Sequence, residues 1–106
     1  MRKEVFVEEE FIKIIEYRKK FLIGPEVPNE IKVPVHLIKL VQKAYSDQEG
    51  TASVSIFLET EDEFLICYNE VENIDAIFED LLKLKQETNK YRVELYNIVT
   101  CETIDK

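Results

Sequence analysis

The sequence predicts an α+β fold with three helices and a three- or four-stranded, mainly antiparallel sheet, in the order α-α-β-β-α-β. Three observations support this prediction. Thr51 to Asn69 holds two alternating apolar runs around an acidic turn, residues 74–82 repeat apolar side chains at the helical period, and residues 25–34 hold all three prolines. With 106 residues, the chain is expected to form a single domain, 1–106, around one hydrophobic core.

The N-terminal third of the chain is expected to supply two helices. Apolar residues recur at helical spacing from about Val7 to Ile23, with acidic residues in the first turn and basic residues in the last. An additional short strand over Lys3 to Val7, ahead of the first helix, is an alternative left open by the sequence. The proline-containing residues 25–34 are expected to form an extended connector, after which Pro34 begins a second helix with an apolar stripe from Leu37 to Tyr45.

The central hairpin is expected to place Leu58 opposite Phe64, so that two further apolar pairs follow on the same face. Glu59 then lies opposite Glu63, and Asp62 takes the left-handed conformation that a three-residue turn without glycine needs. The face of the sheet that packs in the core is expected to contain Val54, Ile56, Leu58, Phe64, Ile66, Tyr68, Val93 and Leu95.

A third helix is expected after the hairpin, beginning at Asn69 or Asn73 and ending at Asn89. Its apolar stripe is the clearest helical pattern in the chain and contains Ile74, Ile77, Phe78, Leu81 and Leu82. Residues 91–104 are then expected to form one or two strands. The helix would act as a crossover that lays the last strand beside the first hairpin strand, antiparallel to it.

The net charge of −8 lies entirely in the second half of the chain. Residues 1–50 contain nine basic and nine acidic residues, whereas residues 51–106 contain five basic and thirteen acidic residues. No Lys or Arg occurs between Lys43 and Lys83, an interval that holds eleven acidic residues. A field of this sign repels nucleic acid and anionic membranes, and it favours a basic protein as partner.

The motifs that usually carry catalysis do not occur in this sequence. His36 is the single histidine, and it has no Cys or Ser at a spacing typical of a nucleophile and its base. The two glycines lie too far apart for a phosphate-binding loop, and the acidic turn lacks the glycine and the spaced ligands of a calcium loop. We therefore expect no enzymatic activity, no catalytic residue, no metal and no cofactor.

The cysteines and the hydropathy pattern indicate an intracellular protein. Cys67 and Cys101 stand alone in strand-like segments, so buried reduced thiols are expected, and a disulfide between neighbouring strands is the alternative. The N-terminus places acidic residues where a signal peptide needs its apolar stretch, and no apolar run of transmembrane length occurs. The chain is expected to be cytoplasmic and to make no membrane contact.

The second face of the predicted sheet is too apolar to be left wholly in water. Either one of the two N-terminal helices covers it, or it is an apolar interface with a charged rim. The leading hypothesis is a small acidic binding module, of the inhibitor, immunity or anti-defence type, that engages a basic protein surface. Its candidate partner-binding residues are Phe57, Glu59, Glu61, Asp62, Glu63, Leu65, Tyr96 and Ile98. The alternative is a structural or regulatory homo-oligomer, such as a homodimer, that self-associates through this face.

Overall fold

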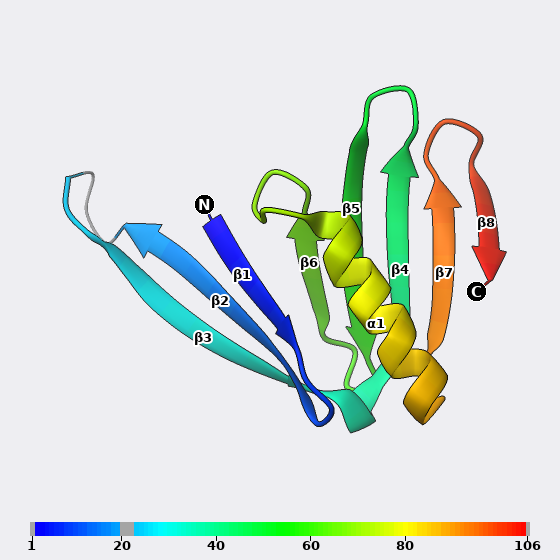
Figure 1. The fold of residues 1–106 in the computed structure, drawn as a ribbon, viewed down its shortest axis with the longest axis horizontal. Helices are drawn as coiled ribbons and strands as arrows, with labels where there is room; N and C mark the ends of the chain where they lie inside the picture. Colours follow the sequence, from blue (N-terminus) through cyan, green and yellow to red (C-terminus); the bar gives the residue numbers. More distant parts are fainter. Residues whose placement is uncertain (1, 20–22, 106) are drawn as a thin grey trace.

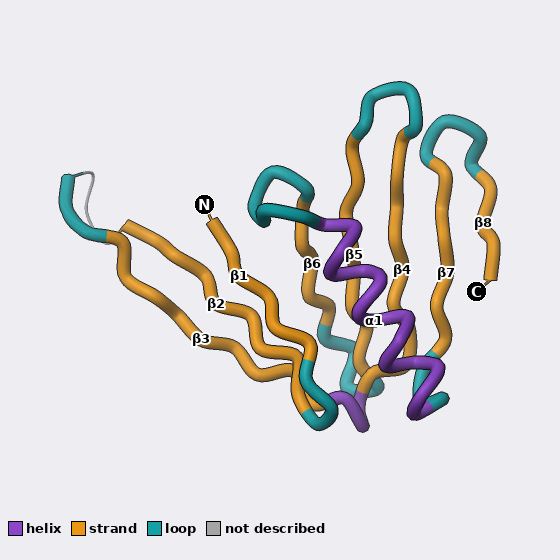
Figure 2. The backbone as a smooth tube through the Cα atoms, viewed as in Figure 1, coloured by secondary structure: helices purple, strands orange, loops and turns teal. Residues whose placement is uncertain are grey.

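The computed structural model describes residues 2–19 and 23–105, which form two β-sheets and one α-helix (Figures 1 and 2). The first sheet has the order β1-β2-β3, with β1 at Arg2–Val7, β2 at Phe11–Lys19 and β3 at Glu26–Pro34. The second sheet has the order β6-β5-β4-β7-β8, with β4 at Ile38–Ser46, β5 at Thr51–Leu58, β6 at Glu63–Cys67, β7 at Arg92–Asn97 and β8 at Glu102–Asp105. The 3-10 turn η1 (Val35–Leu37) joins the sheets, and α1 (Ile74–Thr88) connects β6 to β7. The predicted fold class, with three helices and one sheet, is therefore wrong.

The first predicted helix is replaced by β2. Ile12 and Ile14 are buried while Lys13 and Ile15 are only half-buried, which is the alternation of a strand. Helical and alternating patterns overlap over a short apolar run, and β-branched residues favour the strand. The optional N-terminal strand is confirmed as β1. Residues 20–22 of the predicted helix lie outside the described residues.

Two of the three prolines of the predicted connector, Pro28 and Pro34, lie in β3, an edge strand that pairs with β2, and Pro25 directly precedes it. The Val35 N–H donates to the Glu10 carbonyl at 3.0 Å, and hydrogen-bonded pairs alternate along the ladder from there. Pro28 and Pro34 consequently fall at positions whose nitrogen faces away from β2. An edge strand tolerates proline at such positions because no ladder hydrogen bond is lost. The prediction of extended backbone was right, but its assignment to a connector was wrong.

The second predicted helix is reduced to η1, and the rest of its stripe belongs to β4. Pro34 directly precedes η1, but that turn contains only three residues, with His36 exposed. In β4, Val41 is fully buried, whereas its neighbours Leu40 and Gln42 are half-buried. The apolar residues that suggested one helical stripe therefore point to both faces of a strand.

The central hairpin forms with a register that differs by two residues from the predicted one. Ile56 lies opposite Phe64 and Val54 opposite Ile66. Because the side-chain period of a strand is two, this shift preserves which residues share a face. It changes the turn, where Glu61 rather than Asp62 has the left-handed conformation, with φ 73°.

The third helix is confirmed as α1. The Asn73 side chain accepts a hydrogen bond from the Ala76 N–H at 3.1 Å, and Asn89 ends the helix in the left-handed conformation. Residues 91–104 supply two strands, β7 and most of β8. The predicted strand order is wrong, since β7 pairs with β4 and runs parallel to it.

The buried apolar residues of both sheets and of α1 form one cluster. Helix α1 lies across one face of the second sheet, and β1 packs against α1 (Figure 1). Of the eight residues predicted for the core face of the sheet, five are buried and Phe64 and Leu95 are partly buried against them. Tyr68 is the exception, with 47% of its surface exposed. The hairpin thus contributes its predicted face to the core.

Candidate protein-binding surface

The face of the second sheet that is turned away from α1 is called the outer face here. Ile56 and Ile66 are buried on the α1 side, so strand alternation places their neighbours Phe57 and Leu65 on the outer face. Tyr96 lies there by the same alternation along β7. Leu65 is 47% exposed, and Phe57 and Tyr96 are half-buried. Of the two alternatives for this face, cover by an N-terminal helix is wrong, because the described part of the N-terminal region forms strands β1 to β4 and the turn η1.

The acidic turn between β5 and β6 borders this face. Glu63 lies directly opposite Phe57 in the ladder, not opposite Glu59 as predicted. The turn is closed by a hydrogen bond from the Leu58 N–H to the Asp62 carbonyl at 2.9 Å and by one from the Glu61 N–H to the Leu58 carbonyl at 3.0 Å. These backbone bonds give the turn a defined shape, and the Thr60 hydroxyl also donates to the Asp62 carboxylate at 2.8 Å.

All four carboxylates of the turn are exposed, namely those of Glu59, Glu61, Asp62 and Glu63. Within the described residues, none of them forms an ion pair with a basic side chain. The Glu59 N–H donates to the Leu37 carbonyl at 2.7 Å, which anchors the turn to η1. The turn therefore presents uncompensated negative charge on a fixed backbone.

The other two predicted site residues, Tyr96 and Ile98, lie toward the opposite end of the outer face. Ile98 follows β7 and is 50% exposed, and its N–H donates to the Tyr45 carbonyl at 2.8 Å. It lines a shallow hollow of about 280 Å³ whose floor includes the small residues Ala44 and Ser53.

Three polar residues, Gln42, Arg92 and Glu94, form a row on the outer face between Phe57 and the pair Tyr96 and Ile98. Gln42 lies opposite Glu94 in the β4–β7 ladder, and its side-chain amide donates to the Glu94 carboxylate at 3.4 Å. Arg92 forms an ion pair with Glu94 at 2.8 Å and approaches Asp105 at 4.0 Å. The structure thus brings Phe57, Leu65 and the acidic turn together, and it places Tyr96 and Ile98 across this row on the same face.

The two cysteines are free thiols in different environments. Cys67 is half-buried and lines the hollow beside Ser53. Burial, together with the negative charge of Glu70, raises the pKa of the Cys67 thiol. Cys101 is exposed and has a positive φ of 57°, so the expectation that both thiols are buried is wrong for this residue.

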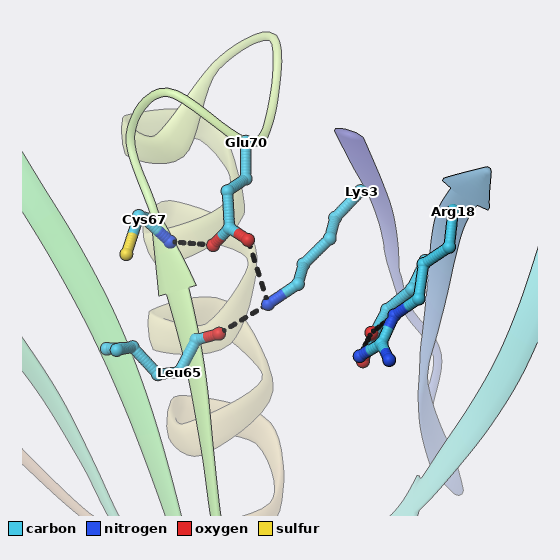
Figure 3. A network of polar contacts seen from close by, with 6 residues as sticks. Lys3, Arg18, Leu65, Cys67 and Glu70 are labelled. Carbon is cyan, nitrogen blue, oxygen red and sulfur yellow. Dashed lines mark hydrogen bonds and ion pairs between the residues drawn. The ribbon is translucent and has the colours of Figure 1, made fainter. Parts of the chain in front are cut away.

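Sequence reasoning missed a polar joint between the two sheets, which we call the Lys3–Glu70 clasp (Figure 3). The Lys3 ammonium lies 3.2 Å from the Glu70 carboxylate and donates to the Leu65 carbonyl at 2.8 Å. The other Glu70 carboxylate oxygen accepts from the Cys67 N–H at 2.9 Å, and the Lys3 N–H donates to the Glu70 carbonyl at 2.7 Å. The clasp ties β1 to β6 through both side chains and backbone.

The clasp is largely withdrawn from water, with 12% of the Lys3 side chain and 16% of the Glu70 side chain exposed. Burial alone would raise the pKa of Glu70, but the Cys67 N–H and the Lys3 ammonium outweigh it, and the pKa is lowered from 4.5. No local sequence signal pointed to the clasp, because it joins segments that are distant in the sequence, and Lys3 and its acceptor Leu65 are 62 residues apart.

Comparison with protein-family models, with curated proteins and with solved structures finds no match for this chain. Among residues 2–19 and 23–105, no group of three or more His, Cys, Asp or Glu side chains is placed to hold a metal ion. No helix in the described part of the chain has the length and apolar character needed to cross a membrane. The outer face and its acidic turn therefore remain the candidate site on their own geometry.

Proposed function

We propose that this chain is a small acidic protein-binding module whose outer face and acidic turn engage a basic protein surface. The observation that carries the proposal is the continuity of apolar and acidic residues at one end of the face, where Phe57 and Leu65 adjoin Glu63 and the rest of the turn. Apolar residues rimmed by charge are the usual composition of a protein interface. Inhibitors and immunity or anti-defence proteins are the functional class that this charge pattern favours.

The proposal assigns different tasks to the two components of the surface. The carboxylates of the turn are exposed and form no ion pair with a described basic residue, so they would steer a basic partner and speed its association. Phe57 and Leu65 would supply the buried contact that slows dissociation. Salt should therefore weaken association mainly through its rate constant.

The test uses affinity capture from lysate of the native host, followed by kinetic measurements on the purified captured protein. Replacing Glu61, Asp62 and Glu63 by lysine is expected to lower the association rate constant by about 10-fold to 1000-fold at low salt and to flatten its salt dependence. The control is a triple replacement of Asp47, Glu49 and Asp80 by lysine, which changes the net charge equally away from the turn.

The two triple variants separate a specific surface from a general charge effect. A turn variant that associates as fast as the wild type, with the same salt dependence, would contradict the proposed function. Equal losses in both variants would do the same, since net charge rather than the turn would then be responsible.

Self-association through the outer face is the second candidate, because neither α1 nor the first sheet lies on this side of the second sheet. Two copies would each bring a net charge of −8, which opposes their approach at low salt. Sedimentation at high protein concentration decides between the candidates. A strict monomer in both low and high salt would exclude the homodimer, whereas a dimer that Leu65→Glu dissociates would favour it.

A further inference from the structure

The two sheets end in four edge strands, β1, β3, β6 and β8. An edge strand carries unpaired N–H and C=O groups, and proteins usually block such an edge with proline, a charged side chain or a neighbouring element. On three of the four edges in the described chain, proline or a neighbouring element blocks outward-facing backbone groups. On the fourth edge, β8, the described residues leave these backbone groups open, and the protection comes from the charged side chains of Glu102 and Asp105.

The block on β3 consists of prolines. Pro28 and Pro34 occupy two of the positions that face away from β2, so the free edge lacks donors there. An incoming strand would lose those two hydrogen bonds along the length of β3.

The block on β6 and β1 is the Lys3–Glu70 clasp. The outward-facing groups of β6 include the Leu65 carbonyl, which accepts from the Lys3 ammonium, and the Cys67 N–H, which donates to Glu70. The outward N–H of Lys3 on β1 donates to the Glu70 carbonyl, and α1 packs against the same strand. Lys3 and Glu70 thus hydrogen-bond to outward-facing backbone groups of two edge strands, β1 and β6 (Figure 3).

The free edge of β8 can be assigned from the hydrogen-bond alternation of its neighbours. Ile98 donates its N–H to the Tyr45 carbonyl, toward β4, so the odd-numbered residues of β7 bond to β8. Their partners in β8 are Glu102 and Ile104. The N–H and C=O groups of Thr103 and Asp105 therefore face outward, and no described residue hydrogen-bonds to them.

We propose that β8 accepts an extended basic segment of the partner as a sixth strand of the second sheet, an inference that rests on the proposed function. The exposed strand reads Glu102, Thr103, Ile104 and Asp105. Thr103 and Asp105 share one face of this strand, and Glu102 and Ile104 share the other. An added strand that alternates basic and apolar residues would therefore place lysine or arginine opposite Asp105 and an apolar side chain opposite Ile104, which is 49% exposed.

The same charges argue against a second copy of this chain as the added strand. Two copies would each bring a net charge of −8 to the pair, and both strands would carry the carboxylates of Glu102 and Asp105. Charges of the same sign repel one another, which opposes this pairing. A basic strand removes this repulsion, so charge complementarity selects the partner.

The experiment titrates the full chain with an acetylated synthetic peptide of about eight residues that alternates Lys and Val, monitored by amide NMR shifts and hydrogen exchange. We expect shifts concentrated on residues 102–105 and slower exchange of the Thr103 and Asp105 amides. The same peptide with every backbone nitrogen methylated keeps the charge but has no N–H to donate to a ladder, and its affinity should be at least about tenfold lower.

Two variants of β8 give the complementary test. Thr103→Pro removes an outward N–H without removing a bond to β7, and it should weaken binding of the Lys-Val peptide about tenfold. Thr103→Val keeps that N–H and should bind within about twofold of the wild type. If Thr103→Pro fails to fold, Asp105→Pro and the N-methylated peptide serve the same comparison.

The outcomes distinguish this inference from the proposed function. Equal binding of the two peptides, absence of binding by the Lys-Val peptide, or unchanged affinity of Thr103→Pro would overturn strand addition at β8. If the peptide instead loses affinity only for the Glu61, Asp62 and Glu63 lysine variant, the acidic turn is the binding site and the inference fails while the proposed function stands. Loss of affinity with Thr103→Pro and not with Thr103→Val supports it.

Discussion

Replacing Ile14 by alanine is expected to lower the free energy of unfolding by about 2 to 5 kcal/mol, whereas Ile15→Ala should cost about 1 kcal/mol or less. Ile14 is 2% exposed and belongs to the core cluster, while Ile15 is half-buried on the other face of β2. In the helix predicted from the sequence, both residues would lie on the apolar stripe. Urea denaturation of the two variants, followed by circular dichroism, measures the difference.

This pair of variants also tests the strand assignment of β2. A strand separates consecutive residues onto opposite faces, so the two costs must differ. Similar large losses from Ile14→Ala and Ile15→Ala would contradict the alternation. Ile12→Ala serves as the matched positive control, because Ile12 is fully buried on the same face as Ile14.

Breaking the Lys3–Glu70 clasp is expected to have the second large effect. Glu70→Gln should lower the free energy of unfolding at pH 7 by about 1 to 3 kcal/mol, because a poorly solvated ammonium loses its counter-charge. The matched control is Glu72→Gln, an exposed residue in the same loop, which should change stability by less than about 0.5 kcal/mol. Equal effects of the two substitutions would contradict the role assigned to the clasp.

The clasp also predicts a pH dependence with a definite sign. The pKa of Glu70 in the folded protein is lowered from 4.5, so its contribution is complete above about pH 4.5 and is lost as the pH falls through the folded value. The stability difference between the wild type and Glu70→Gln should therefore shrink below about pH 4.5. Denaturation curves of both proteins at several pH values between 3 and 7 measure it, and a constant difference would contradict the prediction.

The parts of the fold that could be predicted are those in which the spacing of apolar residues fits either a helix or a strand, but not both. In α1 the apolar residues match a helix and not a strand, and Asn73 and Asn89 mark its ends. The central hairpin alternates over two runs, so its faces could be assigned even though the register was two residues out. Clear local periodicity is therefore enough to assign an element and the face that it buries.

The N-terminal half could not be predicted because its apolar residues fit two periods at once. Ile14 and Ile15 fit a helical stripe because they are adjacent, whereas Ile12 and Ile14 fit the alternation of a strand. Long-range pairing decided between the two, as β2 has partners on both sides in β1 and β3. Pairing of this kind leaves no signal in a single sequence window.

One part of the candidate site could be predicted, namely the part that follows from the alternation of side chains along the two hairpin strands. Phe57, Leu65 and the acidic turn are local to the hairpin, and they lie together on the structure. The polar row of Gln42, Arg92 and Glu94 was missed, since it depends on β4 being a strand beside β7. The clasp was missed because it joins segments that are distant in the sequence.

The distance in sequence between the two halves of the clasp also bears on how the chain folds as it is synthesised. The hairpins of the first sheet are made of local contacts and can form as soon as the N-terminal third leaves the ribosome. The side chains of this sheet that are buried in the folded protein, such as Ile12 and Val33, can be buried only after α1 and the second sheet have been synthesised. Docking of β1 through Lys3 to Glu70 would then be a late folding step. An N-terminal fragment that ends before β4 should consequently expose its apolar face and aggregate.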